Sequence, residues 1–359
     1  MKSKTQLWAV LLDANDNLNA YTQNLDAIPV RSIALEREVS INAAFFAGHL
    51  ERTLLRLNVA QRAAWIPALM TGDQGYVNEA YAYGILAERN FIFTPVASMP
   101  SANLYRASVG TTDLDGSFHH HGIYFDIKSL SRPSGILENL LDEVNARINP
   151  NNKFARANGS LDFYQQELNG TAFQAAVEAI VNASTHQNSY SHPGLGVTFR
   201  FHDVAAGIQW TEGTFSPYRF ARENRHIVIT NAKQVPRNEC FMFIYVYSEL
   251  DHELAVFPDF SSIGERALAR RVFCDLTRDH ALAARYCAKT DPTATVGEVA
   301  RSIGGLAFVR ICQRNSTSDI RFYLNPNANA GQHLTANQVE QMADFGQGVI
   351  VDDFHFDNY

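Results

Sequence analysis

Arg106 is the first residue whose type and place could serve chemistry, because it ends the short apolar run Leu104-Tyr105-Arg106. An arginine at the end of a buried strand is costly to place unless an anion meets it. Its planar guanidinium suits a phosphate, since the fork makes two parallel charge-assisted hydrogen bonds. The simpler alternative is an ion pair with a carboxylate on the same sheet.

Histidine clusters offer other chemistry, but their spacing argues against it. His119, His120 and His121 are adjacent, and side chains alternate along a strand, so the three cannot face one metal. No HExxH pattern follows them. A hydrolase that uses His202 or His252 with a cysteine nucleophile would also lack its motif, because no Gly-x-Ser-x-Gly and no Cys-Gly context occurs. We therefore predict no metal site and no hydrolase triad.

Apolar periodicity predicts helices first and strands later. Residues 1–95 are mainly helical in pattern, and two prolines within 94–100 indicate a connector. The sequence therefore predicts an α+β fold, with a helical N-terminal region followed by a mixed or antiparallel β core. The predicted helices are 35–57, 76–90, 134–148, 161–182, a helix from His202, 265–276, 281–288 and one within 335–345. The predicted strands are 103–106, 197–201, 226–230, 240–248, 305–313 and 320–324.

Composition is that of a globular protein and restricts its partners. The chain has 359 residues, 46% hydrophobic and 19% charged, with a net charge of −7. This charge argues against a general nucleic-acid binder. No apolar run approaches the 18 or so residues of a membrane span. The N-terminal apolar run is too short for a secretory signal, and the four cysteines lack CxxC spacing, so a reducing cytoplasm is expected.

The order of the segments resembles the cholera- and pertussis-type ADP-ribosyltransferase toxins. That family carries an arginine on its first strand, a Gly-aromatic segment before a helix, a hydroxyl motif on a later strand, an aromatic strand and a catalytic glutamate on a loop. The similar segments here are NLYR (103–106), FHHHGIYF (118–125), GLGVTFRF (194–201), FMFIYVYS (241–248) and GEVARSIGG (297–305). The resemblance covers residues 103–314 and implies an ADP-ribosyltransferase core with NAD as its substrate.

The resemblance also implies a role for each matching residue. The bond between nicotinamide and ribose breaks through an oxocarbenium-like transition state, which an adjacent anion stabilises. Glu298 would supply this anion, Arg106 would hold the phosphates or ribose of NAD, and Thr198 would orient the glutamate. Ordinary alternatives are a solvated glutamate and a core threonine. The other implied NAD contacts are Tyr105, Gly122 and Tyr124.

Two positions depart from the family pattern. The hydroxyl motif is reduced to Thr198 alone, and Val296 stands where the family often has Glu or Gln two positions before the catalytic glutamate. Glu253 does have an acidic residue, Asp251, at that spacing. Glu253 is therefore a rival catalytic residue, although it follows the aromatic strand more closely than the family's intervening segment allows. The departure at Val296 concerns the acceptor more than NAD binding.

The resulting hypothesis is a bacterial effector or toxin that transfers ADP-ribose from NAD to a host protein. Ubiquitin, actin and G proteins are possible acceptors, and a specialised secretion system would deliver the protein to the host cytoplasm. The alternatives are an NAD glycohydrolase on the same fold and a non-catalytic effector that binds a host protein. We divide the chain into a target-recognition or delivery region at 1–95, a catalytic domain at 100–325 and a tail at 326–359. Nucleic acid and a membrane span are not expected.

Overall fold

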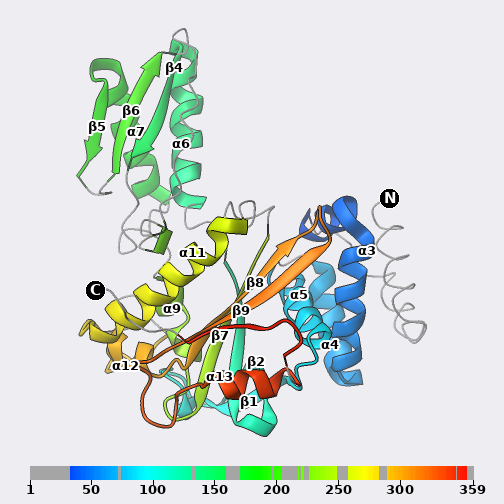
Figure 1. Cartoon of the computed structure of the whole chain (residues 1–359). Helices are drawn as coiled ribbons and strands as arrows, with labels where there is room; N and C mark the ends of the chain where they lie inside the picture. Colours follow the sequence, from blue (N-terminus) through cyan, green and yellow to red (C-terminus); the bar gives the residue numbers. More distant parts are fainter. Residues whose placement is uncertain are drawn as a thin grey trace. The chain divides into compact units, whose positions relative to one another are not determined.

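The computed structural model forms two compact units, which are described separately (Figure 1). Unit 1 contains Met1–Ser131 and Ile227–Tyr359, and unit 2 contains Arg132–His226. Contacts thus group the N-terminal helices and the C-terminal segment with the main sheet, whereas the sequence suggests boundaries at residues 95 and 325. The structure describes residues 33–71, 74–130, 135–158, 170–193, 195, 197–203, 217, 220–221, 226–248, 258–282, 289–344 and 346–353.

Unit 1 is built on a mixed seven-stranded sheet with the order β1-β2-β3-β7-β8-β9-β10. Strands β1, β2 and β3 are antiparallel neighbours, β3, β7 and β8 are parallel, β8 and β9 are antiparallel, and β9 and β10 are parallel. Unit 2 lies in the crossover that connects β3 to β7. The bounds are β1 Thr94–Pro100, β2 Thr111–Phe118, β3 Ile123–Ser129, β7 Cys240–Ser248, β8 Gly305–Cys312, β9 Thr317–Leu324 and β10 Ile350–Asp352.

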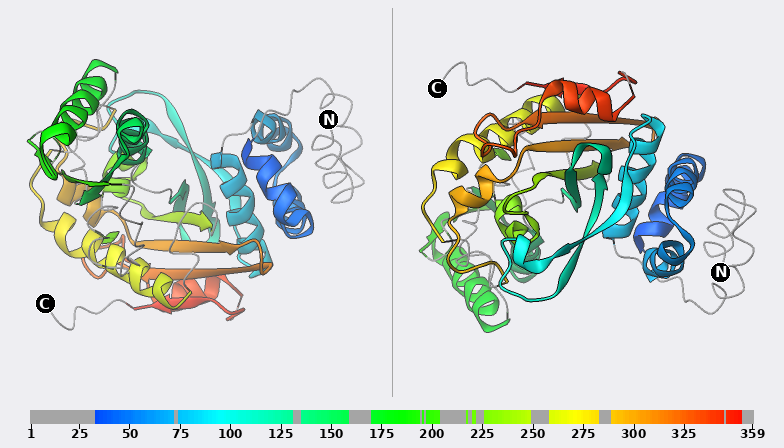
Figure 2. Two further views of the ribbon diagram at one scale, coloured as in Figure 1. Left: turned by 90° about the horizontal axis from the view of Figure 1, so that it is seen from above. Right: turned by 90° about the horizontal axis from the view of Figure 1, so that it is seen from below.

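The N-terminal helices cover one face of this sheet. Helix α5 (Gln74–Glu88) lies against the sheet, and α3 (Ile33–Arg56) and α4 (Val59–Thr71) pack on α5 (Figure 2). Helix α5 is apolar almost all round, as expected for a helix that is buried between two layers. Phe125 and Ile127 of β3 belong to the resulting core.

The opposite face of the sheet carries polar groups and is covered by α11 (Pro258–Arg270). We call it the polar face. Its members alternate with the residues that pack toward α5, so strand geometry assigns them to the other side. They are Asp126 and Lys128 of β3, Tyr245 and Tyr247 of β7, Arg310 of β8, and Asp319, Arg321 and Tyr323 of β9.

Unit 2 has its own core and a three-stranded antiparallel sheet in the order β4-β6-β5. Phe199, Val197 and Ala155 point from this sheet into a core that is shared with the helices. The bounds are α6 Gly135–Ile148, β4 Lys153–Asn158, α7 Gly170–His186, β5 Ser189–His192 and β6 Val197–Asp203.

The predicted α+β fold class is confirmed, and so are most of its elements. The apolar strands at 240–248, 305–312 and 320–324 are present, as are helices at 33–56, 74–88, 135–148 and 336–342. Helix α7 agrees with the second half of the predicted helix at 161–182, whose first residues lie outside the described part. No helix in the described part of the chain is long and apolar enough to cross a membrane.

Several local predictions are wrong. The predicted connector 94–100 is the edge strand β1, a place where prolines are tolerated because one side of the strand makes no ladder bonds. The predicted strand at 226–230 is the short helix α9 (His226–Thr230). Val228 and Ile229 are both buried there, which strand alternation would not allow on a one-sided sheet. His202 and Asp203, where a helix was predicted to begin, continue β6, and the rest of that predicted helix lies outside the described residues.

Candidate functional site

Asp115 of β2 and Asp126 of β3 lie opposite each other, one residue beyond the pair Gly116–Phe125. Gly116 pairs with Phe125, so Asp115 and Asp126 are the next residues along the two strands. The Asp115 carboxylate accepts the Ile127 N–H at 2.6 Å, which places it beside Asp126. The Tyr83 hydroxyl of α5 donates to the Asp115 carbonyl at 2.5 Å and fixes the backbone at the same point.

Lys128 completes a carboxylate–carboxylate–ammonium group with these aspartates. Its Nζ lies 2.5 Å from Oδ2 of Asp126, which makes the two a close ion pair. Burial raises the pKa of Asp126, and the neighbouring charge of Asp115 raises it further, while Lys128 opposes both. Burial by itself lowers the pKa of Lys128, but the charges of Asp126, Asp115 and Glu79 outweigh it and raise that pKa. We therefore take Lys128 as a cation among carboxylates.

Asp126 lacks the hydrogen bonds that a buried carboxylate normally has. It is fully buried, and in the described part of the chain the Lys128 ammonium is the one cation at its oxygens, with no backbone N–H or hydroxyl donating to them. The Tyr245 hydroxyl, on the neighbouring strand and the same face, is also fully buried and has no partner. Burial raises the pKa of Tyr245, and so does the charge of Asp126. Buried polar groups without partners are rare and call for an explanation, such as a ligand or an ion.

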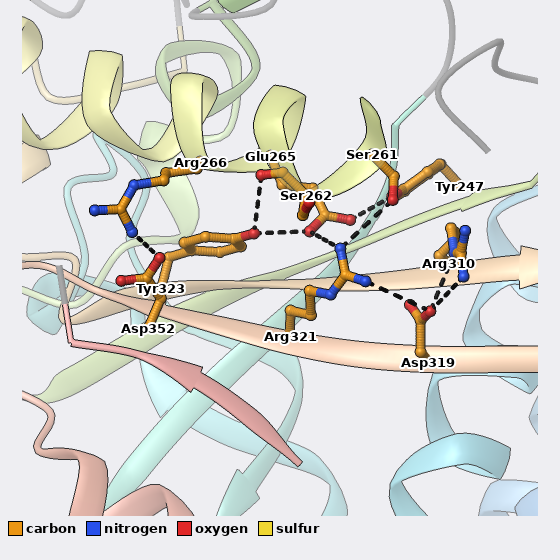
Figure 3. A network of polar contacts seen from close by, with 10 residues as sticks. All are labelled: Tyr247, Ser261, Ser262, Glu265, Arg266, Arg310, Asp319, Arg321, Tyr323 and Asp352. Carbon is orange, nitrogen blue, oxygen red and sulfur yellow. Dashed lines mark hydrogen bonds and ion pairs between the residues drawn. The ribbon is translucent and has the colours of Figure 1, made fainter. Parts of the chain in front are cut away.

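A second polar network lies on the same face around Glu265 of α11 (Figure 3). This carboxylate is fully buried and accepts hydrogen bonds from Tyr247 and, at 2.9 Å, from Tyr323. Arg321 lies 3.5 Å from its second oxygen. Burial raises the pKa of Glu265 to about 7, although the hydrogen bond from Tyr247 and the charge of Arg321 act in the opposite direction.

The network continues along β8 and β9. Arg310 donates to Asp319 at 2.6 and 3.1 Å, and Asp319 lies 3.9 Å from Arg321 (Figure 3). One Arg310 nitrogen, Nη1, is buried without a partner. Tyr247 pairs with Arg310 across the parallel strands, two residues after Tyr245. The polar face therefore combines carboxylates, phenols and guanidinium groups toward the carboxyl ends of β3, β7 and β8.

These groups limit which metal could bind. No three histidine, cysteine, aspartate or glutamate side chains converge closely enough to hold a metal by themselves among the residues that the structure describes. Mg²⁺ is commonly bound by only one or two carboxylates, together with water and substrate phosphate. Asp115 and Asp126 fit that requirement, and their oxygens are the ligand type that Mg²⁺ prefers.

The chain segments that carry the predicted Arg106 and Glu298 are connected through Tyr105. Its hydroxyl hydrogen-bonds Ser302 at 2.9 Å and lies 3.5 Å from the Glu298 carbonyl. Arg106 is adjacent in the chain and forms an isolated bridge with Thr290. The predicted strand at 103–106 is therefore replaced by isolated bridges between three loops.

Around Arg106, two buried polar atoms have no hydrogen-bond partner among the described residues. Arg106 donates to Thr112 at 3.3 Å, but its Nε is buried without a partner. The Thr290 hydroxyl is also buried and without a partner. The Arg237 guanidinium stacks on Tyr105 at 4.5 Å and pairs with Asp291.

Glu298 lies in a helix and not on the predicted loop. It is the third residue of α12 (Val296–Arg301), where it forms a reciprocal capping box with Thr295. Its Oε2 accepts the Thr295 N–H at 2.7 Å and the Thr295 hydroxyl at 2.9 Å. These hydrogen bonds, and to a lesser degree the charges of Arg301 and Arg237, lower the pKa of Glu298.

The other predicted site residues are on β6, on β3, in the β2–β3 hairpin and outside the described residues. Thr198 is on β6 of unit 2 and bonds Ser191 at 2.8 Å, whereas Arg106 and Glu298 belong to unit 1. Tyr124 is a half-buried residue of β3, and Gly122 has a positive φ of 63° in the β2–β3 hairpin. Glu253 lies outside the described residues.

Sequence reasoning missed the aspartates and Lys128. The sequence signal is the run Asp126-Ile127-Lys128 on one strand, together with Asp115 on the strand that precedes it in the chain. The three adjacent histidines that lie between these strands are the more conspicuous feature of the sequence. The pairing of β2 with β3 is needed to recognise that Asp115 and Asp126 meet.

Comparison with known proteins identifies no relative. Protein-family models, curated proteins and solved structures all gave no match.

Proposed function

We propose that this protein is a divalent-metal-dependent phosphodiesterase that cleaves nucleic acid. The single observation that carries the proposal is the group formed by Asp115, Asp126 and Lys128 on neighbouring strands. Asp126 is fully buried, and the neighbouring charge of Asp115 opposes its ionisation further. A divalent cation between them would reverse this cost, because both carboxylates would then face a positive charge.

The shortage of hydrogen-bond donors around Asp126 and Tyr245 favours a catalytic role for this group over a purely structural ion pair. A structural pair is stable when further hydrogen bonds satisfy its remaining lone pairs. Beyond the Lys128 ion pair, no backbone or hydroxyl donor of the described residues meets Asp126, and the Tyr245 hydroxyl on the neighbouring strand has no hydrogen-bond partner there. Substrate phosphate and metal-bound water would supply partners for both.

The chemistry required is attack of water on phosphorus. The new phosphorus–oxygen bond forms as the bond to the leaving oxygen breaks, and negative charge grows on the phosphate. Asp115 and Asp126 would hold the metal, and a bound divalent cation would supply Lewis-acid chemistry, polarising the phosphate and lowering the pKa of the attacking water. Lys128 would stabilise the growing charge once the metal neutralises Asp126, and the Tyr245 hydroxyl would donate to a phosphate oxygen.

The test is cleavage of labelled oligonucleotides with and without Mg²⁺ or Mn²⁺. We expect the wild-type protein to cleave only with metal, and Asp126→Asn to lose activity by at least about 100-fold. Lys128→Met should also lose activity while still binding metal. Asp113→Asn is the matched control, since Asp113 is an exposed aspartate on β2, the neighbouring strand that also carries Asp115.

Metal binding is read separately from cleavage. Mg²⁺ or Mn²⁺ should raise the Tm of the wild-type and Asp113→Asn proteins but not that of Asp126→Asn. If no metal raises the wild-type Tm and no oligonucleotide is cut, the Asp115–Asp126–Lys128 group is structural and the proposal fails.

ADP-ribosyl transfer from NAD to a host protein by a secreted bacterial effector is the second candidate. The observation that favours it is the pair of unsatisfied buried atoms, Arg106 Nε and Thr290 Oγ1, close to the chain that carries Glu298. An arginine with a free buried nitrogen suits a phosphate of NAD. An ADP-ribosyltransferase core and an NAD glycohydrolase activity belong to this same candidate.

Glu298→Gln gives a sharp test of this second candidate. Glutamine occupies the equivalent position of the capping box in α13 (Ala336–Met342), so the substitution removes the charge and keeps the cap. Labelled NAD and a eukaryotic lysate should then give a labelled band with wild type but not with Glu298→Gln or Arg106→Ala. Nicotinamide release without a band would indicate a glycohydrolase, and neither product would eliminate the candidate.

A further inference from the structure

Among the described residues of unit 2, helices α6 and α7 pack on only one face of the sheet. Val197, Phe199 and Phe201 of β6 point toward α6 and α7, so the residues between them point the other way. Strand pairing brings Phe154 beside His202, Arg156 beside Arg200, and Ser191 beside Thr198. We call these six residues the open face; all are exposed or half-buried.

The two arginines of the open face have no anionic partner. Arg156 and Arg200 are directly opposite each other on antiparallel strands, an arrangement in which like charges repel. No carboxylate pairs with either of them in the described part of the chain. Two adjacent guanidinium groups without counter-charge favour an anionic partner.

An aromatic platform lies next to this pair. The rings of Phe154 and His202 are stacked with centroids 5.1 Å apart and an angle of 24°. The Arg156 guanidinium lies over the Phe154 ring at 5.5 Å. Flat rings beside guanidinium groups are the features that bind unstacked bases and the adjoining phosphates.

We infer that the open face of unit 2 binds single-stranded RNA. A base would stack on Phe154 and His202, and the neighbouring phosphates would contact Arg156 and Arg200. An acidic protein segment would use the arginines but would leave the stacked rings without a function. Duplex would present no free base to the rings.

The row beyond the arginines favours RNA over DNA. Ser191 and Thr198 share one hydrogen bond at 2.8 Å, which leaves the pair a further donor and free lone pairs. A ribose 2′-hydroxyl both donates and accepts, and it can therefore bond this pair. The choice of RNA rests on the proposed phosphodiesterase in one respect: single-stranded RNA would be the substrate class of that activity.

The test is fluorescence anisotropy of the full chain with labelled U15 RNA in EDTA, so that binding is measured without cleavage. Arg200→Gln and Phe154→Leu should each weaken binding by about tenfold, and Arg200→Gln should also reduce the salt dependence by about one ion. The matched control is Arg147→Gln on α6, which removes one positive charge outside the open face and should leave binding within twofold.

Ultraviolet cross-linking gives a readout that needs no variant. Cross-linked peptides should contain residues 153–158 or 197–203, and a cross-link confined to other peptides would overturn the inference. Polyglutamate that competes as well as RNA at equal charge would show a general anion surface and overturn it as well. Equal binding of dT15 would overturn the choice of RNA.

The two proposals fail separately. RNA binding without metal-dependent cleavage would support the open face and reject the phosphodiesterase. Metal-dependent cleavage that is unaffected by Arg200→Gln and Phe154→Leu would support the phosphodiesterase and reject the open face as its RNA-binding surface.

Discussion

At the scale of single residues, Asp126 combines an unfavourable environment with a useful position. It lies on β3, fully buried between β2 and β7, where Asp115 is a like-charged neighbour and Lys128 is the opposing cation. Groups that are held in such places reduce stability and are typical of functional sites.

The cost of this carboxylate can be measured with Asp126→Asn in metal-free buffer at pH 8. We expect Tm to rise by about 2–4 °C, corresponding to roughly 1 kcal/mol, because the amide carries no charge to desolvate. Differential scanning fluorimetry with EDTA measures it, and Asp113→Asn should show no rise. A lower Tm for Asp126→Asn would mean that the ion pair with Lys128 stabilises the fold.

Glu265 predicts a pH dependence of stability. Its folded pKa is about 7 against an ordinary 4.5, so the folded protein retains a proton that the unfolded chain loses. Stability is therefore full below about pH 4.5 for this group and is lost as pH rises through 7. Glu265→Gln should remove a loss of about 3 kcal/mol between pH 5 and 8. Urea titrations at both pH values test this, and an unchanged pH dependence in the variant would contradict it.

The sequence allowed part of the sites to be predicted at this scale. Tyr105, Arg106 and Glu298 were chosen from a family-like order, and the Tyr105–Ser302 hydrogen bond places their segments together. Asp115 and Asp126 were missed, because each is ordinary until strand pairing makes them neighbours. Burial without partners cannot be read from a single sequence.

At the scale of elements, close packing of α3 and α5 depends on Gly84. A Cβ at this position would lie 2.7 Å from the backbone of His49, so the helices would have to separate. This contact lets α5 lie between α3 and the sheet.

Gly84→Ala is expected to destabilise unit 1 by about 1–3 kcal/mol through overpacking, despite the higher helix propensity of alanine. Chemical denaturation monitored by circular dichroism measures it. The control is Gly48→Ala on α3, where the nearest group is the flexible Arg52 side chain at 3.4 Å. That variant should be neutral or more stable, and a neutral Gly84→Ala would show that the helices can shift.

Strong local patterns made many elements predictable. The aromatic strand β7 is buried on both faces, and its continuous apolar run identifies it without other information. Residues 226–230 show the limit, since their β-branched run forms α9 instead. There, tertiary packing of adjacent apolar side chains outweighs strand propensity.

At the scale of the whole molecule, the two cores are separate. Unit 2 packs around Phe199, and the core cluster on the α5 side of unit 1 includes Phe125. Each cluster consists of side chains from its own unit only.

Separate cores predict two unfolding transitions in differential scanning calorimetry. Phe199→Ala removes a fully buried ring and should lower only one of them, at a cost of about 3–5 kcal/mol. Phe125→Leu should lower only the other. A single transition that moves with both variants would show that the units unfold together.

Net charge gave an incomplete view of possible partners. Unit 2 contains eight Lys and Arg and nine Asp and Glu, a net charge of −1, so −6 of the total −7 belongs to unit 1. The expectation that nucleic acid is not a partner rests on the total, whereas recognition depends on the local arrangement of Arg156 and Arg200.

Unit 1 consists of two chain segments, Met1–Ser131 and Ile227–Tyr359, which are synthesised at different times. On the ribosome, β3 emerges more than 100 residues before its neighbour β7, which corresponds to about 5–20 s of translation. During this interval the β7-facing edge of β3 has no partner, and the chain that emerges is that of unit 2. The nascent chain therefore needs protection from aggregation at this stage, and slow synthesis or scarce chaperones would reduce the yield of folded protein before any mature contact is tested.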